Sequence, residues 1–110
     1  MSLQPLERGA VWLINLDPTV GSEIRKTRPC VVISPPELHN HLRTALIAPL
    51  TSQGFPAPFR IQTRFEGRNG LILLDQIRAV DRRRLIKCLG QLEPETLSIV
   101  LSTLQELFAP

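Results

Sequence analysis

The sequence predicts an α+β domain in which a small, strongly curved antiparallel sheet is followed by one C-terminal helix. Two observations support this class: short apolar runs alternate with turn signals along most of the chain, and the hydrophobic period becomes helical after Pro94. A length of 110 residues matches one domain, so residues 1–110 are expected to share a single core. A chain this short buries a limited share of its surface, which favours association with a permanent partner or into a homodimer.

Six short apolar runs are expected to form the strands. The first is rich in strand formers and ends at Asp17-Pro18. The second starts at Pro29 and is ended by Ser34-Pro35-Pro36, because proline removes a donor from the sheet ladder. Polar residues interrupt the fifth run, which indicates a bend between two strands. The six runs span residues 10–17, 29–33, 44–49, 59–64, 70–80 and 86–92.

Loops and one helix account for the rest of the chain. Residues 19–27 have no apolar periodicity and predict a loop, residues 37–43 form a short polar segment, and Gln53-Gly54 and Arg68-Asn69-Gly70 are expected turns. Pro94 suits a first helical position, and apolar residues recur at helical spacing up to Phe108. This pattern predicts an amphipathic helix that docks on the sheet.

The charge is modest but dominated by arginine. The net charge is +3, and Lys26 and Lys87 are the only lysines in the sequence. Arginine binds phosphate bidentately and stacks on bases, which favours a nucleic acid ligand; a solvated, slightly basic surface is the alternative. No apolar run resembles a secretion signal or a membrane span, so the cytoplasm is the expected location.

The sequence lacks the motifs that several common enzyme chemistries require. The sequence has no Gly-rich phosphate loop, no Cys or His set with metal spacing and no nucleophilic serine elbow, so neither a cofactor nor a metal is expected. His39 and His41 lack the flanking ligands of a metal site and are expected on a solvated loop. Cys30 and Cys88 lie in apolar stretches and are expected to be reduced structural residues, although adjacent strands would allow a bridge.

The loop before the second strand gathers a carboxylate and three cations between Gly21 and Pro29. Pro29 restricts Arg28 to extended geometry, and the strand that follows fixes where its side chain leaves the sheet. This predicts a positioned cation at Arg28. A surface ion pair with Glu23, worth at most about 1 kcal/mol, is the alternative.

Four separated blocks resemble the MazF/PemK family of toxin ribonucleases, over roughly residues 8–108. The blocks are Asp17-Pro18-Thr19 with Gly21-Ser22-Glu23; Thr27-Arg28-Pro29 with Val31-Val32-Ile33-Ser34-Pro35; Ala48-Pro49-Leu50-Thr51-Ser52; and the run from Gly70 to Arg78 with Val80-Asp81 and Arg84-Leu85. Leu89-Gly90 then precedes the terminal helix. The resemblance implies a compact, SH3-like barrel that forms a homodimer and cleaves single-stranded RNA at short motifs.

Carried over from the family, the catalytic pair is Arg28 and Thr51, with Glu23 a weaker third. Attack of a 2′-hydroxyl on its own phosphate needs a base, a proton for the leaving 5′-oxygen and stabilisation of the phosphorane, but no metal. Arg28 is expected to neutralise the phosphorane and help protonate the leaving oxygen, and the Thr51 hydroxyl to donate to a non-bridging oxygen. Glu23 is either the base or the group that orients Arg28. The products would carry a 2′,3′-cyclic phosphate and a 5′-hydroxyl.

Other residues are expected to contact RNA, with surface solvation or an internal hydrogen bond as the alternative for each. These residues are Arg25, Lys26, Asn40, Ser52, Gln76 and Arg78. Trp12 lies in an apolar strand and is expected in the core or a dimer interface.

Two other functions are alternatives to RNA cleavage. A gyrase-poisoning toxin of the same fold would carry a tryptophan near its C-terminus, where this chain has Leu107-Phe108-Ala109-Pro110. A basic barrel that only binds nucleic acid would need neither Arg28 nor Thr51. The resemblance also implies a cognate antitoxin with an acidic, disordered segment, steered to the toxin by charge, and no membrane partner.

Overall fold

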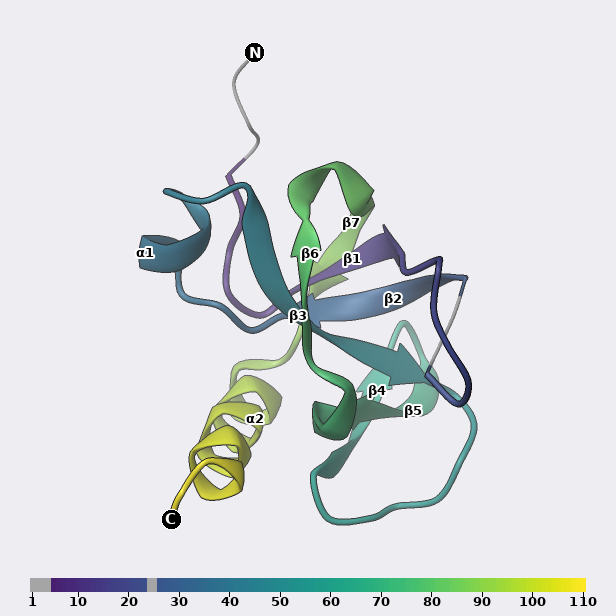
Figure 1. Ribbon diagram of the computed structural model, residues 1–110. Coiled ribbons are helices and arrows are strands. Elements are labelled where there is room, and N and C mark those ends of the chain that lie inside the picture. The colour runs from purple at the N-terminus through teal and green to yellow at the C-terminus, as the bar shows by residue number, and fades with distance from the viewer. Residues whose placement is uncertain (1–4, 24–25) are drawn as a thin grey trace.

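The computed structural model describes residues 5–23 and 26–110 as a curled antiparallel sheet with a C-terminal helix (Figure 1). The strands are β1 (Ala10–Asn15), β2 (Thr27–Val32), β3 (Thr44–Thr51), β4 (Arg60–Phe65), β5 (Arg68–Leu73), β6 (Arg78–Asp81) and β7 (Leu85–Gln91). The helices are α1 (Pro36–His39) and α2 (Pro94–Leu107), with 3-10 turns η1 (Leu74–Gln76) and η2 (Arg82–Arg84). The predicted fold class is confirmed, including the bend that splits residues 70–80 into β5 and β6.

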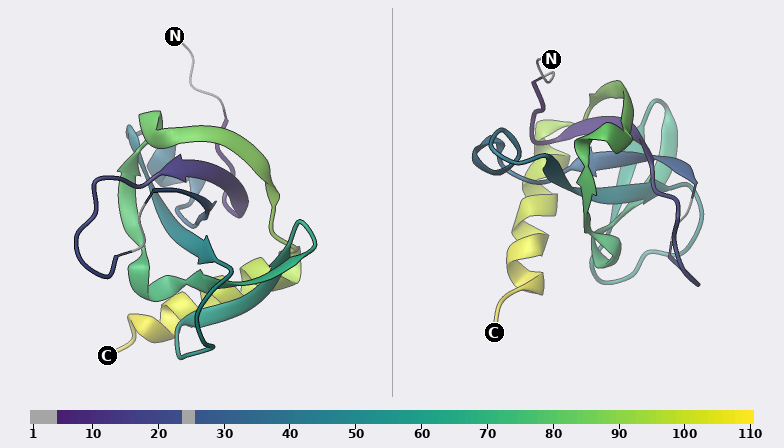
Figure 2. Two further views of the ribbon diagram at one scale, coloured as in Figure 1. Left: turned by 90° about the vertical axis from the view of Figure 1, so that its right-hand side faces the viewer. Right: turned by 45° about the horizontal axis from the view of Figure 1, so that its top comes forward.

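The central strand β3 causes the curl of the sheet. The strand order is β4-β5-β3-β2-β1-β7, with β6 also paired to β3. On one edge β3 pairs first with β6, over residues 44–47, and then with β5 through Leu50 and Thr51. Because one strand serves two partners along the same edge, the sheet turns back on itself, as Figure 2 shows.

Both faces of β1, β2 and β3 are buried. Cys30, Val32 and Ile47 join one apolar cluster, which also holds Trp12. Val31 and Ala48, their alternating neighbours, join a second cluster that α2 covers with Val100, which is fully buried. Burial on both faces explains why these strands are continuous apolar runs in the sequence, and it confirms the expected core position of Trp12.

The turn expected at Arg68-Asn69-Gly70 is wrong. Arg68 and Asn69 lie in β5, paired with Phe65 and Arg64 of β4, and the two-residue turn is Glu66-Gly67. Both turn residues have positive φ, 53° at Glu66 and 76° at Gly67, which matches the tight turns that suit the twist of a β-hairpin. Because the turn lies two residues earlier than predicted, Arg68 and Asn69 belong to a regular strand.

The expected exposure of His39 is also wrong, whereas His41 is exposed as expected. His39 is fully buried at the end of α1. Its Nε2 donates to the Leu6 carbonyl, and the Ser34 hydroxyl lies 2.8 Å from its Nδ1. The Leu46 amide donates to the same hydroxyl at 3.2 Å. Through these contacts His39 ties the segment before β1 to the residues that follow β2 and, by way of Ser34, to β3.

The two cysteines are free, and only Cys30 is buried, so the expectation that Cys88 is structural is wrong. Both residues are aligned with Trp12 of β1, Cys30 from β2 on one side and Cys88 from β7 on the other. Two interstrand spacings separate them by about 10 Å, which is beyond the reach of a disulfide.

Alkylation is expected to distinguish these thiols. Burial raises the pKa of the Cys30 thiol to about 12, so almost no reactive thiolate forms there at pH 8. Iodoacetamide should add one group to the native protein and two after denaturation in guanidinium chloride, as counted by intact mass. The Cys88→Ser variant is the control and should remain unmodified when native. Equal native labelling of both cysteines would contradict the prediction.

An ion pair links β4 to η1. Arg60 Nε donates to Asp75 Oδ1 at 3.0 Å and Arg60 Nη2 donates to Asp75 Oδ2 at 2.8 Å. These hydrogen bonds hold the pKa of the Asp75 carboxyl below its ordinary value of 3.8.

The Arg60–Asp75 pair is expected to make a small, pH-dependent contribution to stability. A lowered pKa in the folded state means that the contribution is present above pH 3.8 and is lost as the pH falls below it. The side chains are 30% and 40% exposed, so solvent screening keeps the contribution below about 1 kcal/mol. Urea unfolding should therefore show Asp75→Asn to be less stable than the wild type at pH 7, with the gap closing towards pH 2.5. A gap of the same size at both pH values would contradict the prediction.

Candidate active site

The strand register brings Arg28 and Thr51 to the same end of the sheet. In the β2–β3 pair, Cys30 lies opposite Pro49, Val31 opposite Ala48 and Val32 opposite Ile47. Continuing this register by two residues would set Arg28 across from Thr51. The start of β2 and the end of β3 do lie together, on the right of Figure 1.

A cavity of about 460 Å³ lies at this end of the sheet, where β2, β3 and the β4–β5 hairpin meet; we call it the inner cavity. Its volume suits a ligand of nucleotide size. It is lined by Arg28, Pro29, Leu50, Thr51, Ser52, Thr63, Phe65, Glu66, Arg68, Asn69 and Gly70. Arg28 and Thr51, the predicted catalytic pair, and the predicted contact residue Ser52 thus share one cavity.

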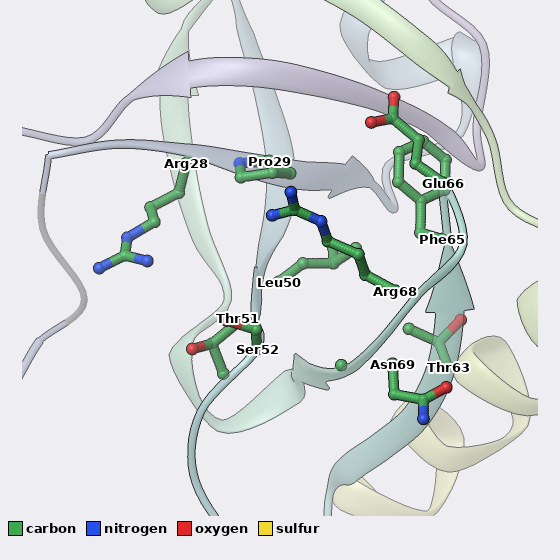
Figure 3. Close-up of a pocket in the computed structure, with 11 residues that line it drawn as sticks. Arg28, Pro29, Leu50, Thr51, Ser52, Thr63, Phe65, Glu66, Arg68 and Asn69 are labelled. Carbon is green, nitrogen blue, oxygen red and sulfur yellow. The ribbon is translucent and has the colours of Figure 1, made fainter.

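Arginine side chains give the inner cavity its positive charge. Arg28 is half-buried on β2, opposite Ile14 of β1. Arg68 reaches from β5 into the middle of the cavity, beside Pro29 and Leu50 (Figure 3). Glu66 is the one carboxylate among the described lining residues, so cations outnumber anions and an anionic ligand is favoured.

The geometry around Thr51 leaves its hydroxyl proton available. The Gln53 amide donates to Thr51 Oγ1 at 3.2 Å, which occupies one acceptor site on that oxygen. A threonine hydroxyl can accept one hydrogen bond and still donate its own proton. Thr51 can therefore donate to an anionic ligand in the cavity while the backbone of the following loop holds its oxygen. Sequence reasoning offered no local argument of this kind for Thr51.

The fold does not bring Glu23 together with Arg28 and Thr51. It is exposed in the β1–β2 loop, where its Oε1 accepts from the Val20 amide at 2.7 Å, and it does not line the inner cavity. Lys26, also exposed, has its amide bonded to Asp17 Oδ1 at 2.8 Å. Arg25, another predicted contact residue, lies outside the described residues.

The remaining predicted contact residues do not line the inner cavity. Asn40 caps the C-terminal end of α1, at the opposite side of Figure 1 from the cavity. Gln76 is half-buried in η1. Arg78, half-buried on β6, donates from Nη1 to the Leu16 carbonyl at 3.2 Å, which matches the internal hydrogen bond named as the alternative.

Sequence reasoning missed the contribution of the β4–β5 hairpin. Thr63, Phe65, Arg68 and Asn69 line the inner cavity, but the sequence pattern predicts a turn at the last two. The available signal was Glu66-Gly67, which has a glycine at its second position, as tight hairpin turns often do. In residues 5–23 and 26–110, no three His, Cys, Asp or Glu side chains lie close enough to hold a metal ion. No helix in the same ranges is long and apolar enough to cross a membrane.

The fold and the inner cavity define a small curled-sheet protein with a cationic, hydroxyl-lined site. Residues 7–108 match the family described as PemK-like, MazF-like toxin of type II toxin-antitoxin system, and the chain belongs to this family. This membership confirms the resemblance read from the sequence.

Curated relatives and solved structures agree with this assignment. The chain is 34% identical over 106 residues to Endoribonuclease EndoA of Bacillus subtilis, covering 91% of each protein. It is 32% identical over 83 residues to Endoribonuclease PemK of Escherichia coli, which covers 71% of this chain and 62% of PemK. MazF (Form-I) from Deinococcus radiodurans superimposes with a TM-score of 0.83 at 26% identity, covering 94% of this chain and 96% of that one. MazE-MazF (Form-I) from the same organism gives 0.71 at 26% identity, with the same coverage.

Proposed function

We propose that this chain is an endoribonuclease toxin that cleaves single-stranded RNA without a metal ion. The observation that carries the proposal is the placement of Arg28 and the Thr51 hydroxyl in one cationic cavity of nucleotide size. Relatives named as endoribonucleases, EndoA and PemK, support the same activity. Nothing in the inner cavity favours gyrase poisoning or binding without cleavage.

The proposed reaction is an internal transesterification. The 2′-hydroxyl loses its proton to a base and forms a bond to phosphorus, and the bond from phosphorus to the 5′-oxygen breaks. The leaving oxygen takes up a proton, so the products carry a 2′,3′-cyclic phosphate and a 5′-hydroxyl. Arg28 neutralises the charge that builds up on the phosphorane, and Thr51 donates to a non-bridging oxygen. An arginine with an ordinary pKa above 12 is a poor acid near neutrality, so the electrostatic role of Arg28 matters more.

The identity of the base is a separate part of the proposal. Glu23 is proposed either as the base or as the group that orients Arg28, and Glu66, which lines the inner cavity where Glu23 does not, is the alternative base. Removing the base flattens the acidic limb of the pH profile of kcat, because no carboxylate then has to lose its proton. Comparison of Glu23→Gln with Glu66→Gln identifies the base as the residue whose loss has this effect.

We also propose the partners that the family implies. A homodimer fits the small size of the chain, and an antitoxin with an acidic, disordered segment fits the cationic inner cavity. The antitoxin would exclude RNA by occupying this cavity. The MazE-MazF complex supports an antitoxin partner for the relative from Deinococcus radiodurans. Competition by an acidic peptide should weaken as salt rises, because the attraction is electrostatic. The cytoplasm, where messenger RNA is translated, is the proposed location.

Incubation of the purified protein with RNA of mixed sequence in excess EDTA tests the proposed function. We expect fragments with 2′,3′-cyclic phosphate and 5′-hydroxyl ends. An oligonucleotide with a single 2′-deoxy substitution at the mapped cleavage position should resist cleavage, because it lacks the nucleophile. Intact RNA, or equal cleavage of the 2′-deoxy substrate, would contradict the mechanism.

A further inference from the structure

The β4–β5 hairpin separates the inner cavity from a second one of about 480 Å³, which we call the outer cavity. The outer cavity lies between the hairpin and the loop that follows β3. It is lined by Ser52, Gly54, Pro56, Gln62, Thr63, Arg64, Asn69, Gly70 and Leu71. Its volume also suits one nucleotide.

The register of the hairpin assigns its side chains to two faces. Residues paired across an antiparallel ladder point to the same side, and successive residues alternate. The pairs Gln62 with Leu71 and Arg64 with Asn69 therefore share one face. The pairs Thr63 with Gly70 and Phe65 with Arg68 share the other. The first face gives all four of its residues to the outer cavity, and the second gives all four to the inner cavity.

The polar side chains of the outer cavity are available to a ligand. Gln62, Arg64 and Asn69 are exposed, and in the part of the chain that the structure describes they form no hydrogen bond or ion pair through their side chains. Two carboxamides supply donors and acceptors together, and the guanidinium supplies a positive charge. This combination is suited to a nucleotide, because amides read base edges and arginine binds phosphate.

The two cavities are continuous in their lining. Ser52, Thr63, Asn69 and Gly70 contribute to both, so the two cavities adjoin, with Ser52 directly after the end of β3. An RNA strand held by Arg28 and Thr51 would therefore place a neighbouring nucleotide against Gln62, Arg64 and Asn69.

We propose that the outer cavity binds the nucleotide next to the cleaved one and selects its base through Gln62 and Asn69. Arg64 binds the phosphate of that nucleotide. The preferred base is one that presents a donor and an acceptor side by side, as adenine does to a carboxamide. This inference rests on the proposed function, since it assumes that the inner cavity holds the RNA that is cut.

Two measurements test base selection. Cleavage of a random RNA pool gives the base preference around each cut, and selection from a random 2′-O-methyl RNA pool gives the same preference without cleavage. For the wild type we expect one strongly preferred base beside the cut. In Gln62→Leu that preference should fall about tenfold or more while cleavage continues, and adding Asn69→Leu should abolish it. Gln105→Leu, an exposed amide on α2, is the control and should keep the wild-type preference.

The salt dependence of RNA binding tests the role of Arg64. Arg64→Ala should weaken binding to all sequences alike and reduce the slope of log affinity against log salt by about 0.7, as expected for one lost phosphate contact on a single strand. Arg43→Ala removes an exposed arginine that lines neither cavity and should leave the slope unchanged.

The outcomes separate this inference from the proposed function. An unchanged base preference in the double variant, or an unchanged salt slope in Arg64→Ala, would overturn the inference while cleavage stands. If the wild type leaves RNA intact but Gln62→Leu still loses the preference found in the 2′-O-methyl pool, the proposed function fails and the outer cavity remains a nucleotide site. Absence of any base preference in the wild-type selection would also overturn the inference.

Discussion

Replacement of Arg28 by alanine is expected to lower kcat for RNA cleavage by about 10²- to 10³-fold, which is typical for loss of one group that stabilises transition-state charge. Arg28 is half-buried at the start of β2 and lines the inner cavity, and Pro29 restricts the backbone of Arg28 to extended geometry, so strand geometry determines where its side chain starts. The measurement is steady-state cleavage of a labelled oligonucleotide over a range of substrate concentrations, which gives kcat and KM separately. KM should change little, because the lost interaction forms mainly as the phosphorane develops.

Two controls accompany this prediction. Arg28→Lys keeps the charge but loses the planar fork, and should fall between the wild type and Arg28→Ala. Arg43→Ala removes an exposed arginine outside the cavity and should retain full activity. Equal rates for Arg28→Ala and the wild type, with both proteins folded by circular dichroism, would exclude Arg28 from the reaction.

The candidate active site could be predicted from the sequence only where local chain geometry was informative. Pro29 after Arg28 is a local signal, whereas Thr51 was named from resemblance, and its position depends on the register between β2 and β3. Arg68 was missed for a similar reason. Its position depends on which two residues form the turn of the β4–β5 hairpin, and a shift of two residues converts a supposed turn residue into a strand residue that faces the cavity.

The fold was easier to predict from the sequence than the site, because the pattern of apolar residues depends directly on which residues are buried. The continuous apolar runs at β1, β2 and β3 correspond to strands buried on both faces, and the helical period after Pro94 corresponds to α2. His39 shows the limit of such patterns. Its burial depends on contact with the Leu6 carbonyl, which is 33 residues away in sequence and has no signature near α1.

Replacement of His39 by leucine is expected to lower the free energy of unfolding by about 2–4 kcal/mol, a large part of the 5–15 kcal/mol typical of a domain. Leucine is similar in volume and stays apolar, so the effect isolates the hydrogen bonds. The Leu6 carbonyl loses the donor from His39 Nε2, and the Ser34 hydroxyl loses its acceptor at Nδ1 while still bonded to the Leu46 amide. Urea unfolding followed by circular dichroism gives the loss, with a melting temperature lower by roughly 10 °C.

His41→Leu is the matched control, because it makes the same chemical change two residues away at an exposed position. We expect a change of less than about 0.5 kcal/mol there, as for most surface substitutions. RNA cleavage at 25 °C should survive in both variants, since neither histidine lines the inner cavity. Equal stability of the two variants would mean that the His39 contacts contribute nothing net to folding. Loss of cleavage in a folded His39→Leu protein would instead show that the segment before β1, which His39 holds, communicates with the cavity at the other end of the sheet.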